Sequence, residues 1–161
     1  MSQKEFFGYK SMYKLKDVLS LERPKKVFLV RGKNSFIKSG ASKIVYSLLK
    51  KNDFVEFSDF SQNPKFDEAK SAYERFSNSG CDLIIGVGGG SCLDVAKSVK
   101  LFNYQDSVEI IPLVAVPTTS GSGSESTYFI VYYIDKKKQS AGYREVTFQD
   151  YSICDLFFIF C

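Results

Sequence analysis

Short apolar runs alternate with segments of helical periodicity along most of this chain, and this alternation constrains the fold more than any other feature. The apolar runs, which are typical of buried strands, are residues 26–31, 54–57, 82–87, 110–116 and 128–134. Between them, apolar side chains recur every three or four residues over segments 41–49, 66–76 and 92–102, which predicts amphipathic helices. Alternating strands and helices form βαβ units, so the sequence predicts a doubly wound α/β fold with a mainly parallel, Rossmann-like sheet.

The last part of the chain departs from this alternation. The apolar run at 128–134 is followed by the charged segment Asp135 to Lys138 and then by residues 142–148. A strand, a charged turn and a second strand in succession predict a β-hairpin, which we expect to be attached to the sheet.

Composition excludes several classes of function. A length of 161 residues with 44% hydrophobic residues is enough for one compact domain. The 22 basic and 18 acidic residues are spread along the chain, and no apolar run approaches the roughly 18 residues of a membrane span, so we expect neither a nucleic-acid partner nor a membrane. The four cysteines form no Cys-x-x-Cys pair and no signal-peptide pattern opens the chain, which together predict a cytoplasmic protein.

The chain contains no histidine. Histidine is the commonest side chain for proton transfer near neutral pH and a frequent ligand of zinc and iron. We therefore expect no imidazole-dependent chemistry from these 161 residues.

A triple glycine, Gly88-Gly89-Gly90, follows the third predicted strand and leads through Ser91 into a predicted helix. Glycines lack the Cβ atoms that would keep a phosphate away from the backbone, and a helix start offers unpaired N–H groups with a partial positive charge. The loop is therefore a candidate pyrophosphate site. The alternative is purely structural, since Ser91 and Asp94 resemble a capping box at the start of the helix.

A second loop, Pro117 to Glu125, is rich in glycine and hydroxyl side chains and follows the next predicted strand. In open α/β sheets, ligands bind outside the carboxyl ends of the strands, so two such loops in succession predict one shared crevice. A flexible connector is the alternative for this segment.

These two loops resemble the signature motifs of iron-containing (group III) alcohol dehydrogenases. Residues 88–97 (GGGSCLDVAK) are similar to the family's GGGSxxDxAK motif, and residues 117–125 (PTTSGSGSE) are similar to its PTTxGTGSE loop. The resemblance extends over nearly all of residues 5–155. It implies the family's nucleotide-binding domain over residues 1–155, followed in the family by a helical domain.

The resemblance implies cofactor roles for residues of both loops. The family's triple-glycine loop binds the pyrophosphate of NAD or NADP, and the aspartate of that motif lies near the nicotinamide. The matching cofactor-binding candidates here are Gly88, Gly89, Gly90, Ser91 and Asp94, together with Thr118, Thr119 and Thr127 from the second loop. Relatives also place a hairpin lysine beside the cofactor, and Lys138 is the closest match, with a solvated turn lysine as the alternative.

Many NAD-using members of this family carry an aspartate after the first long strand, where it binds the adenosine ribose. Here that position is Gly32, flanked by Arg31, Lys33 and Ser35. Without the aspartate, two cations and a hydroxyl remain at this position, and they favour binding of a 2′-phosphate. The alternative is that these are ordinary surface charges after a strand. We therefore expect Gly32 and Ser35 to bind the cofactor, with NADP preferred over NAD.

The family's metal, iron or zinc, is held by one aspartate and three histidines that follow the matched region, and the matching positions lie beyond residue 161. We therefore expect no metal ligands and no catalytic residues in this chain, and little activity from it alone. Residues 156–161 (LFFIFC) replace the family's proline after Asp155, and we expect an apolar tail from an interrupted reading frame, with a true final strand as the alternative.

The resulting functional prediction is the cofactor-binding half of a metal-dependent alcohol dehydrogenase that interconverts an alcohol with an aldehyde or ketone. A homodimer is compatible with the full-length form. The alternatives are a non-catalytic nucleotide-binding module and a member of the glycerol dehydrogenase or dehydroquinate synthase branches, which share the glycine loop. The Pro117 to Glu125 loop favours the alcohol dehydrogenases.

Overall fold

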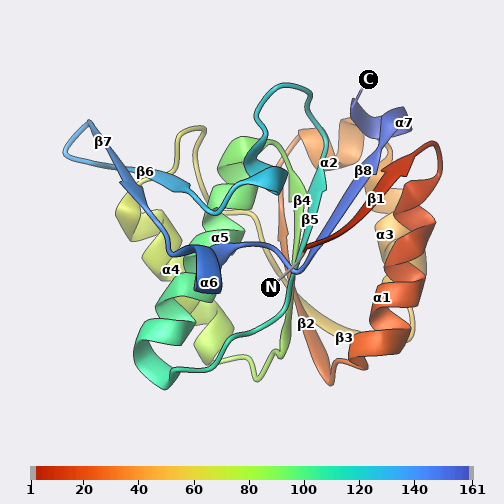
Figure 1. The fold of residues 1–161 in the computed structure, drawn as a ribbon, viewed down its shortest axis with the longest axis horizontal. Helices are drawn as coiled ribbons and strands as arrows, with labels where there is room; N and C mark the ends of the chain where they lie inside the picture. The colour runs from red at the N-terminus through yellow and green to blue at the C-terminus, as the bar shows by residue number, and fades with distance from the viewer. Residues whose placement is uncertain (1–2, 160–161) are drawn as a thin grey trace.

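A computed structural model describes residues 3–159 and contains a six-stranded parallel sheet (Figure 1). In spatial order its strands are β1 (Lys4–Gly8), β8 (Tyr151–Asp155), β5 (Leu113–Pro117), β4 (Leu83–Gly88), β2 (Lys26–Arg31) and β3 (Asp53–Phe57). All neighbouring strands within this sheet pair in parallel. The predicted doubly wound, Rossmann-like α/β fold is confirmed.

Helices cover both faces of this sheet. The main ones are α1 (Leu15–Glu22), α3 (Ala41–Leu49), α4 (Phe66–Ser77) and α5 (Gly90–Ser107). The short ones are α2 (Ser35–Lys38), α6 (Arg144–Thr147), α7 (Leu156–Ile159) and the 3-10 turns η1 (Ser11–Lys14) and η2 (Ser124–Ser126). Within residues 3–159, no helix combines the length and the apolar character that a membrane span requires.

Side-chain alternation along the strands divides the core into two layers. On β2, Val27 and Leu29 join the layer formed with α1, α2 and α3, whereas Phe28 and Val30 join the layer formed with α4 and α5. Figure 1 shows α4 and α5 on one side of the sheet and α1 and α3 on the other. Burial of both faces explains why the strands read as continuous apolar runs.

The chain reverses its direction of travel across the sheet at β2. From β2 the chain passes to β3 at one edge of the sheet. It then returns through helix α4 to β4, which lies on the other side of β2. The carboxyl ends of β2 and β4 therefore flank a topological switch point, where the loops diverge to opposite faces and leave a crevice.

The hairpin differs from its prediction in two respects. Its strands are β6 (Ile130–Ile134) and β7 (Lys137–Ala141), so a second strand over 142–148 is wrong, and α6 occupies part of that segment. Asp135 and Lys136 both have positive φ, which makes the turn only two residues long and lets the second strand resume at once.

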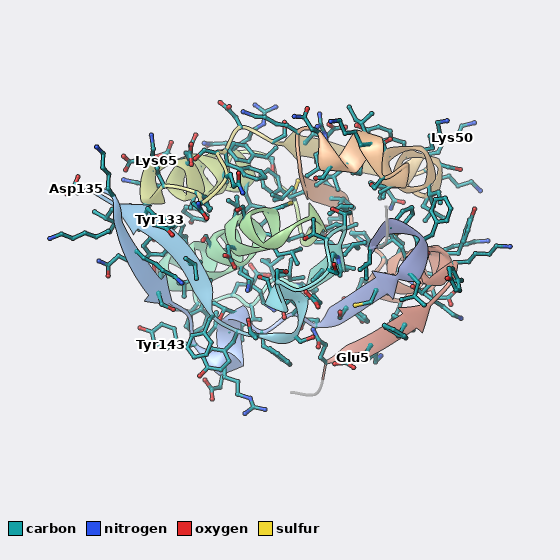
Figure 2. The ribbon with its side chains drawn as sticks, turned by 90° about the horizontal axis from the view of Figure 1, so that it is seen from above. Glu5, Lys50, Lys65, Tyr133, Asp135 and Tyr143 are labelled. Carbon is teal, nitrogen blue, oxygen red and sulfur yellow. The ribbon has the colours of Figure 1, made fainter. Side chains whose placement is uncertain are left out.

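The hairpin also forms its own two-stranded sheet and does not pair with the large one. Instead it packs against helices, with Ile130 of β6 in one buried cluster with Leu101 of α5 and Val146 of α6. Tyr133 forms an isolated bridge with Lys65 at the start of α4, and the two lie close together in Figure 2. The hairpin is therefore held over α4 and α5, above the cleft side of the domain.

Strands β1 and β8 pair with each other at the opposite edge from β3, and neither was expected from apolar periodicity. Asp155 ends β8, and its buried carboxylate accepts hydrogen bonds from the backbone N–H groups of Lys10 (3.1 Å), Met12 (2.9 Å) and Phe157 (3.1 Å). This carboxylate thereby fixes the turn after β1 against the end of β8.

Residues 156–159 form the helical turn α7 rather than a strand, and residues 160–161 of the expected tail lie outside the described part of the chain. Phe158 is buried in the core layer that contains α1 and α3, whereas Phe157 is 58% exposed. The described part of the tail thus contributes one side chain to the core.

Candidate functional site

A cleft with a volume of about 650 Å³ lies at the switch point between β2 and β4. The loop after β2, the triple-glycine loop after β4 and the loop after β3 all line it. Its lining residues are Gly32, Lys33, Asn34, Ser35, Phe60, Ser61, Gln62, Gly89, Gly90, Ser91, Cys92 and Thr119. Six of the predicted cofactor residues, Gly32, Ser35, Gly89, Gly90, Ser91 and Thr119, therefore meet in one cleft.

Close packing explains why the glycine loop contains glycines. A Cβ atom on Gly88 would lie 2.6 Å from Cβ of Cys92 and 3.3 Å from the backbone nitrogen of Gly32. A Cβ atom on Gly89 would lie 3.0 Å from Oγ1 of Thr119, where the glycine loop contacts the loop after β5. Gly88 thus brings β4, β2 and α5 together, while Gly89 keeps the cleft wall free of side chains.

The structural alternative for Ser91 and Asp94, a capping box, is wrong. Gly89 is the N-cap of α5 and makes no side-chain cap bond, and the Ser91 hydroxyl instead accepts a hydrogen bond from the backbone N–H of Asn63 at 3.1 Å. The first N–H groups of α5 therefore receive no cap from the side chain of its N-cap residue. Such groups are available to an anion in the cleft.

Asp94 points toward the second loop. Its Oδ1 atom accepts a hydrogen bond from the Ser124 hydroxyl at 3.0 Å and lies 3.2 Å from Nζ of Lys97. Burial raises the pKa of the Asp94 carboxyl, and the neighbouring Lys97 ammonium and Ser124 hydroxyl partly oppose that rise. Asp94 does not line the cleft between Gly32 and Gly89.

Lys97 has a fully buried side chain and was not predicted as a functional residue. Five oxygen atoms surround its Nζ: Phe129 O (2.5 Å), Ser124 Oγ (2.8 Å), Ser124 O (3.1 Å), Asp94 Oδ1 (3.2 Å) and Thr127 O (3.4 Å). Burial lowers the pKa of Lys97, and the Asp94 carboxylate opposes that change.

The three predicted threonines have different surroundings. Thr119 is exposed at the cleft, whereas Thr118 is 4% exposed and its Oγ1 has no hydrogen-bond partner among residues 3–159. Thr127 lies farther along the loop, where its carbonyl oxygen accepts hydrogen bonds from Gln149 (3.0 Å) and Lys97 (3.4 Å). A buried hydroxyl without a partner is uncommon, so Thr118 is a candidate to bind a ligand group.

The cations beside Gly32 both have acidic partners. Nε of Arg31 lies 2.6 Å from Glu56 in a half-buried pair, and the Arg31 guanidinium also stacks on the Phe36 ring. Lys33 pairs with Asp59 at 3.2 Å, but both side chains are largely exposed, at 56% and 92%. Of the two cations, only Lys33 is therefore free enough to exchange its partner for a phosphate.

Lys138 lies on strand β7, opposite Tyr133, and is exposed. It is not among the residues that line the cleft. The structure therefore does not bring Lys138 together with the six cleft residues, and its cofactor role stays a prediction.

Within residues 3–159, no cluster of three or more histidine, cysteine, aspartate or glutamate residues is arranged to hold a metal ion. The chain also contains no histidine. These residues do not fit the metal that the family resemblance implies, so no chemical step is assigned to a metal on this domain.

Three contributors to the site were missed by sequence reasoning. Lys97 could have been found from the sequence, because it stands among apolar residues of a helix. A lysine that is buried in this way must find oxygen partners within the protein. Residues 60–62 could also have been found, since they follow a predicted strand at its carboxyl end. The bond between Asn63 and Ser91 joins two distant loops, and no local pattern indicated it.

Comparison with known proteins places these features in a family. The model of the family described as iron-containing alcohol dehydrogenase matches residues 2–156. Among curated relatives, the long-chain primary alcohol dehydrogenase AdhA of Thermoanaerobacter ethanolicus is 33% identical over 150 residues, which are 82% of this chain and 38% of that protein. The NADH-dependent butanol dehydrogenase A of Clostridium acetobutylicum is 28% identical over 139 residues, or 76% of this chain and 35% of that protein.

Solved structures agree with this assignment. An iron-containing alcohol dehydrogenase from Thermotoga maritima matches with a TM-score of 0.87 and 28% identity, covering 98% of this chain and 47% of that one. Sulfoacetaldehyde reductase from Bifidobacterium kashiwanohense, solved in complex with NAD+, matches with a TM-score of 0.81 and 26% identity, covering 95% and 44%. The chain thus spans less than half the length of these relatives.

Proposed function

We propose, since the chain belongs to the iron-containing alcohol dehydrogenase family, that its residues 1–155 form the NAD(P)-binding domain of an enzyme that interconverts alcohols with aldehydes or ketones. The observation that carries this proposal is the cleft at the switch point between β2 and β4. There the N-terminus of α5, a glycine loop and a hydroxyl-rich loop converge. A cleft of this composition suits a dinucleotide with an anionic pyrophosphate.

Different residues of the cleft and of the second loop suit different parts of the cofactor. Gly89, Gly90 and Ser91 offer backbone N–H groups at the start of α5, where the pyrophosphate would bind. The loop containing Gly32 and Ser35 would hold the adenosine ribose. The unpartnered Oγ1 of Thr118 supports a ligand group at the second loop. The bound nicotinamide would exchange the hydride with the substrate.

We expect a preference for NADP over NAD, although fewer groups support it than the charges around Gly32 suggested. Arg31 is held by Glu56, so a 2′-phosphate would rely on Lys33 and on the Ser35 hydroxyl. A surface ion pair such as Lys33–Asp59 contributes only about 0–1 kcal/mol, so a doubly charged phosphate would displace Asp59 from it readily. The absence of a carboxylate at Gly32 removes the group that would repel that phosphate.

Titration of the chain with NADPH and with NADH, followed by nicotinamide fluorescence, tests both parts of the proposal. We expect both to bind and NADPH to bind more tightly. The variant Gly32→Asp should shift the preference toward NADH, although its Cβ atom would lie 2.2 Å from Oγ of Ser35 and the hydroxyl must rotate away. Tighter binding of NADH by the unmodified chain would end the NADP argument, and failure of both to bind would overturn the nucleotide site.

We further propose that residues 1–161 by themselves do not turn over alcohols, because their donor set does not fit the family's metal. A non-catalytic nucleotide-binding module would behave in the same way in isolation. Mixing the chain with a separately produced helical domain from a relative separates these two functions. Metal-dependent alcohol oxidation restored by mixing supports the dehydrogenase, and binding without turnover at any metal concentration supports the module.

A further inference from the structure

We propose that Lys97 is a positioning residue, whose buried ammonium group fixes the loop between β5 and β6 so that the loop can bind the nicotinamide half of the dinucleotide. The inference rests on the proposed nucleotide-binding function and extends it to a side chain that lies outside the cleft.

The first reason is the origin of the oxygen atoms around Lys97. Four of the five belong to residues 124–129 of that loop, and three of these four are backbone carbonyl oxygens. One side chain of α5 therefore holds η2, at Ser124, together with the chain that leads into β6. A buried ammonium group requires such partners, because without them the cost of removing it from water is not recovered.

The second reason is continuity between the Lys97 cluster and the cleft. The anchored end of the loop at Ser124 is only a few residues from Ser122 and Thr119, which pack against the glycine loop. Cβ of Ser122 lies 3.2 Å from the position of a Cβ atom on Gly90, and Oγ1 of Thr119 lies 3.0 Å from that on Gly89. Release of the loop at Lys97 would therefore loosen the wall of the cleft on the side of the hydroxyl-rich loop.

The third reason is that the adenosine side of the cleft is built independently. Gly32, Lys33 and Ser35 follow β2, and their contacts are with Val87, Gly88, Asp59 and the start of α2. None of these contacts involves residues 118–129. Loss of Lys97 should therefore weaken binding of the whole dinucleotide and leave binding of its adenosine half unchanged.

Lys100 provides a matched control on the same helix. It is 1% exposed and pairs with Asp150 at 2.6 Å, and its Nζ also donates to the carbonyl oxygen of Phe148 at 3.0 Å. Asp150 in turn accepts a hydrogen bond from the backbone N–H of Leu113, at the amino end of β5 and thus away from the cleft. Lys100→Met removes a buried ion pair of the same kind without releasing the second loop.

The experiment compares Lys97→Met with Lys100→Met in the full chain. The probes are NADPH and 2′,5′-ADP, or NADH and AMP if the unmodified chain prefers NADH. We expect Lys97→Met to raise the dissociation constant of the dinucleotide about tenfold or more, equivalent to about 1.4 kcal/mol, with the adenosine probe unchanged within about twofold. Lys100→Met should leave the ratio of the two dissociation constants as it is in the unmodified chain.

Ser124→Ala is a milder second variant, which keeps the test open if Lys97→Met does not fold. It removes the hydroxyl that bonds both Lys97 and Asp94, and its control is Ser152→Ala, a buried serine on β8 whose hydroxyl contacts Cys154. Selective loss of dinucleotide binding in Ser124→Ala supports the proposal.

Equal weakening of both probes, or equal ratios in the Lys97 and Lys100 variants, would show that Lys97 only stabilises the fold and would overturn the proposal. If neither probe binds the unmodified chain, the nucleotide site itself fails, which is a different result.

Discussion

Alanine substitutions at two adjacent glycines should separate the stability of this domain from its ligand binding. At Gly88, a methyl group would lie 2.6 Å from Cβ and 2.9 Å from Sγ of the buried Cys92, and the Cβ atom cannot move away without the backbone of α5. Relief of this overlap requires β4 and α5 to separate. Overpacking of this kind costs about 1–3 kcal/mol, which lowers the melting temperature of a chain of this size by roughly 2–12 °C.

At Gly89 the same substitution meets a different environment. Its backbone angles, φ −77° and ψ −175°, are accessible to alanine, and the nearest atom is Oγ1 of the exposed Thr119, at 3.0 Å. That hydroxyl can rotate away, so the free energy of unfolding should change by no more than about 0.5 kcal/mol. The methyl group would stand where a phosphate approaches the backbone, and we expect nucleotide affinity to fall about tenfold or more, equivalent to about 1.4 kcal/mol.

Thermal unfolding followed by circular dichroism and NADPH titration of the same samples give the two measurements. We expect Gly88→Ala to lower the stability of the domain whether or not it weakens ligand binding, and Gly89→Ala to weaken ligand binding with little change in stability. Equal falls in melting temperature for the two variants would refute the packing argument, and unchanged NADPH binding by Gly89→Ala would place the ligand elsewhere.

Three further predictions concern strain and thiol chemistry. Val108 follows the last residue of α5, has a φ of 59° and is 72% exposed. Val108→Gly should raise the free energy of unfolding by about 1 kcal/mol and the melting temperature by roughly 2–4 °C. Val108→Ala should give a smaller gain, because alanine keeps a Cβ atom. Burial raises the pKa of the Cys92 thiol above its ordinary value of 9.0, so the contribution of this thiol to stability is complete below pH 9.0 and is lost as the pH rises above that value. In urea unfolding at pH 8 and pH 10, Cys92→Ala should therefore lose less stability between the two pH values than the unmodified chain. In iodoacetamide labelling of the native chain at pH 8, peptide mapping should find Cys154 modified before Cys92, because Cys154 is partly exposed and Cys92 is buried.

Local patterns predicted the central strands because burial on both faces makes them apolar throughout. The edge strand β1 (KEFFG) and its neighbour β8 (YSICD) mix polar and apolar residues, and their pairing joins Lys4 to Tyr151 across nearly the whole chain. No window of sequence contains that information. The hairpin was shifted for a related reason, since Asp135 and Lys136 take up positive φ without the glycine that usually marks such a turn.

The candidate site was predictable to the extent that backbone requirements select residue types. Glycines at a strand-to-helix turn and hydroxyls after the next strand identified two loops, and the fold brings both to one cleft. The cations beside Gly32 were a less reliable guide to phosphate binding, because a count of cations in the sequence ignores their acidic partners. Glu56, which holds Arg31, lies on the neighbouring strand β3 and 25 positions farther along the chain.

Helix α5 connects these observations. Its N-terminus faces the cleft, while the sheet, α4 and the hairpin cover its sides, so it is buried over most of its circumference and has no polar stripe. A lysine on such a helix must find oxygen partners within the protein. Lys97 and Lys100 lie one turn apart and find them in different places. Most partners of Lys97 lie in the loop beside the cleft, and those of Lys100 lie just before the amino end of β8. The same helix that offers its dipole to an anion thus also holds the second loop beside the cleft, through a side chain that is not part of the cleft lining.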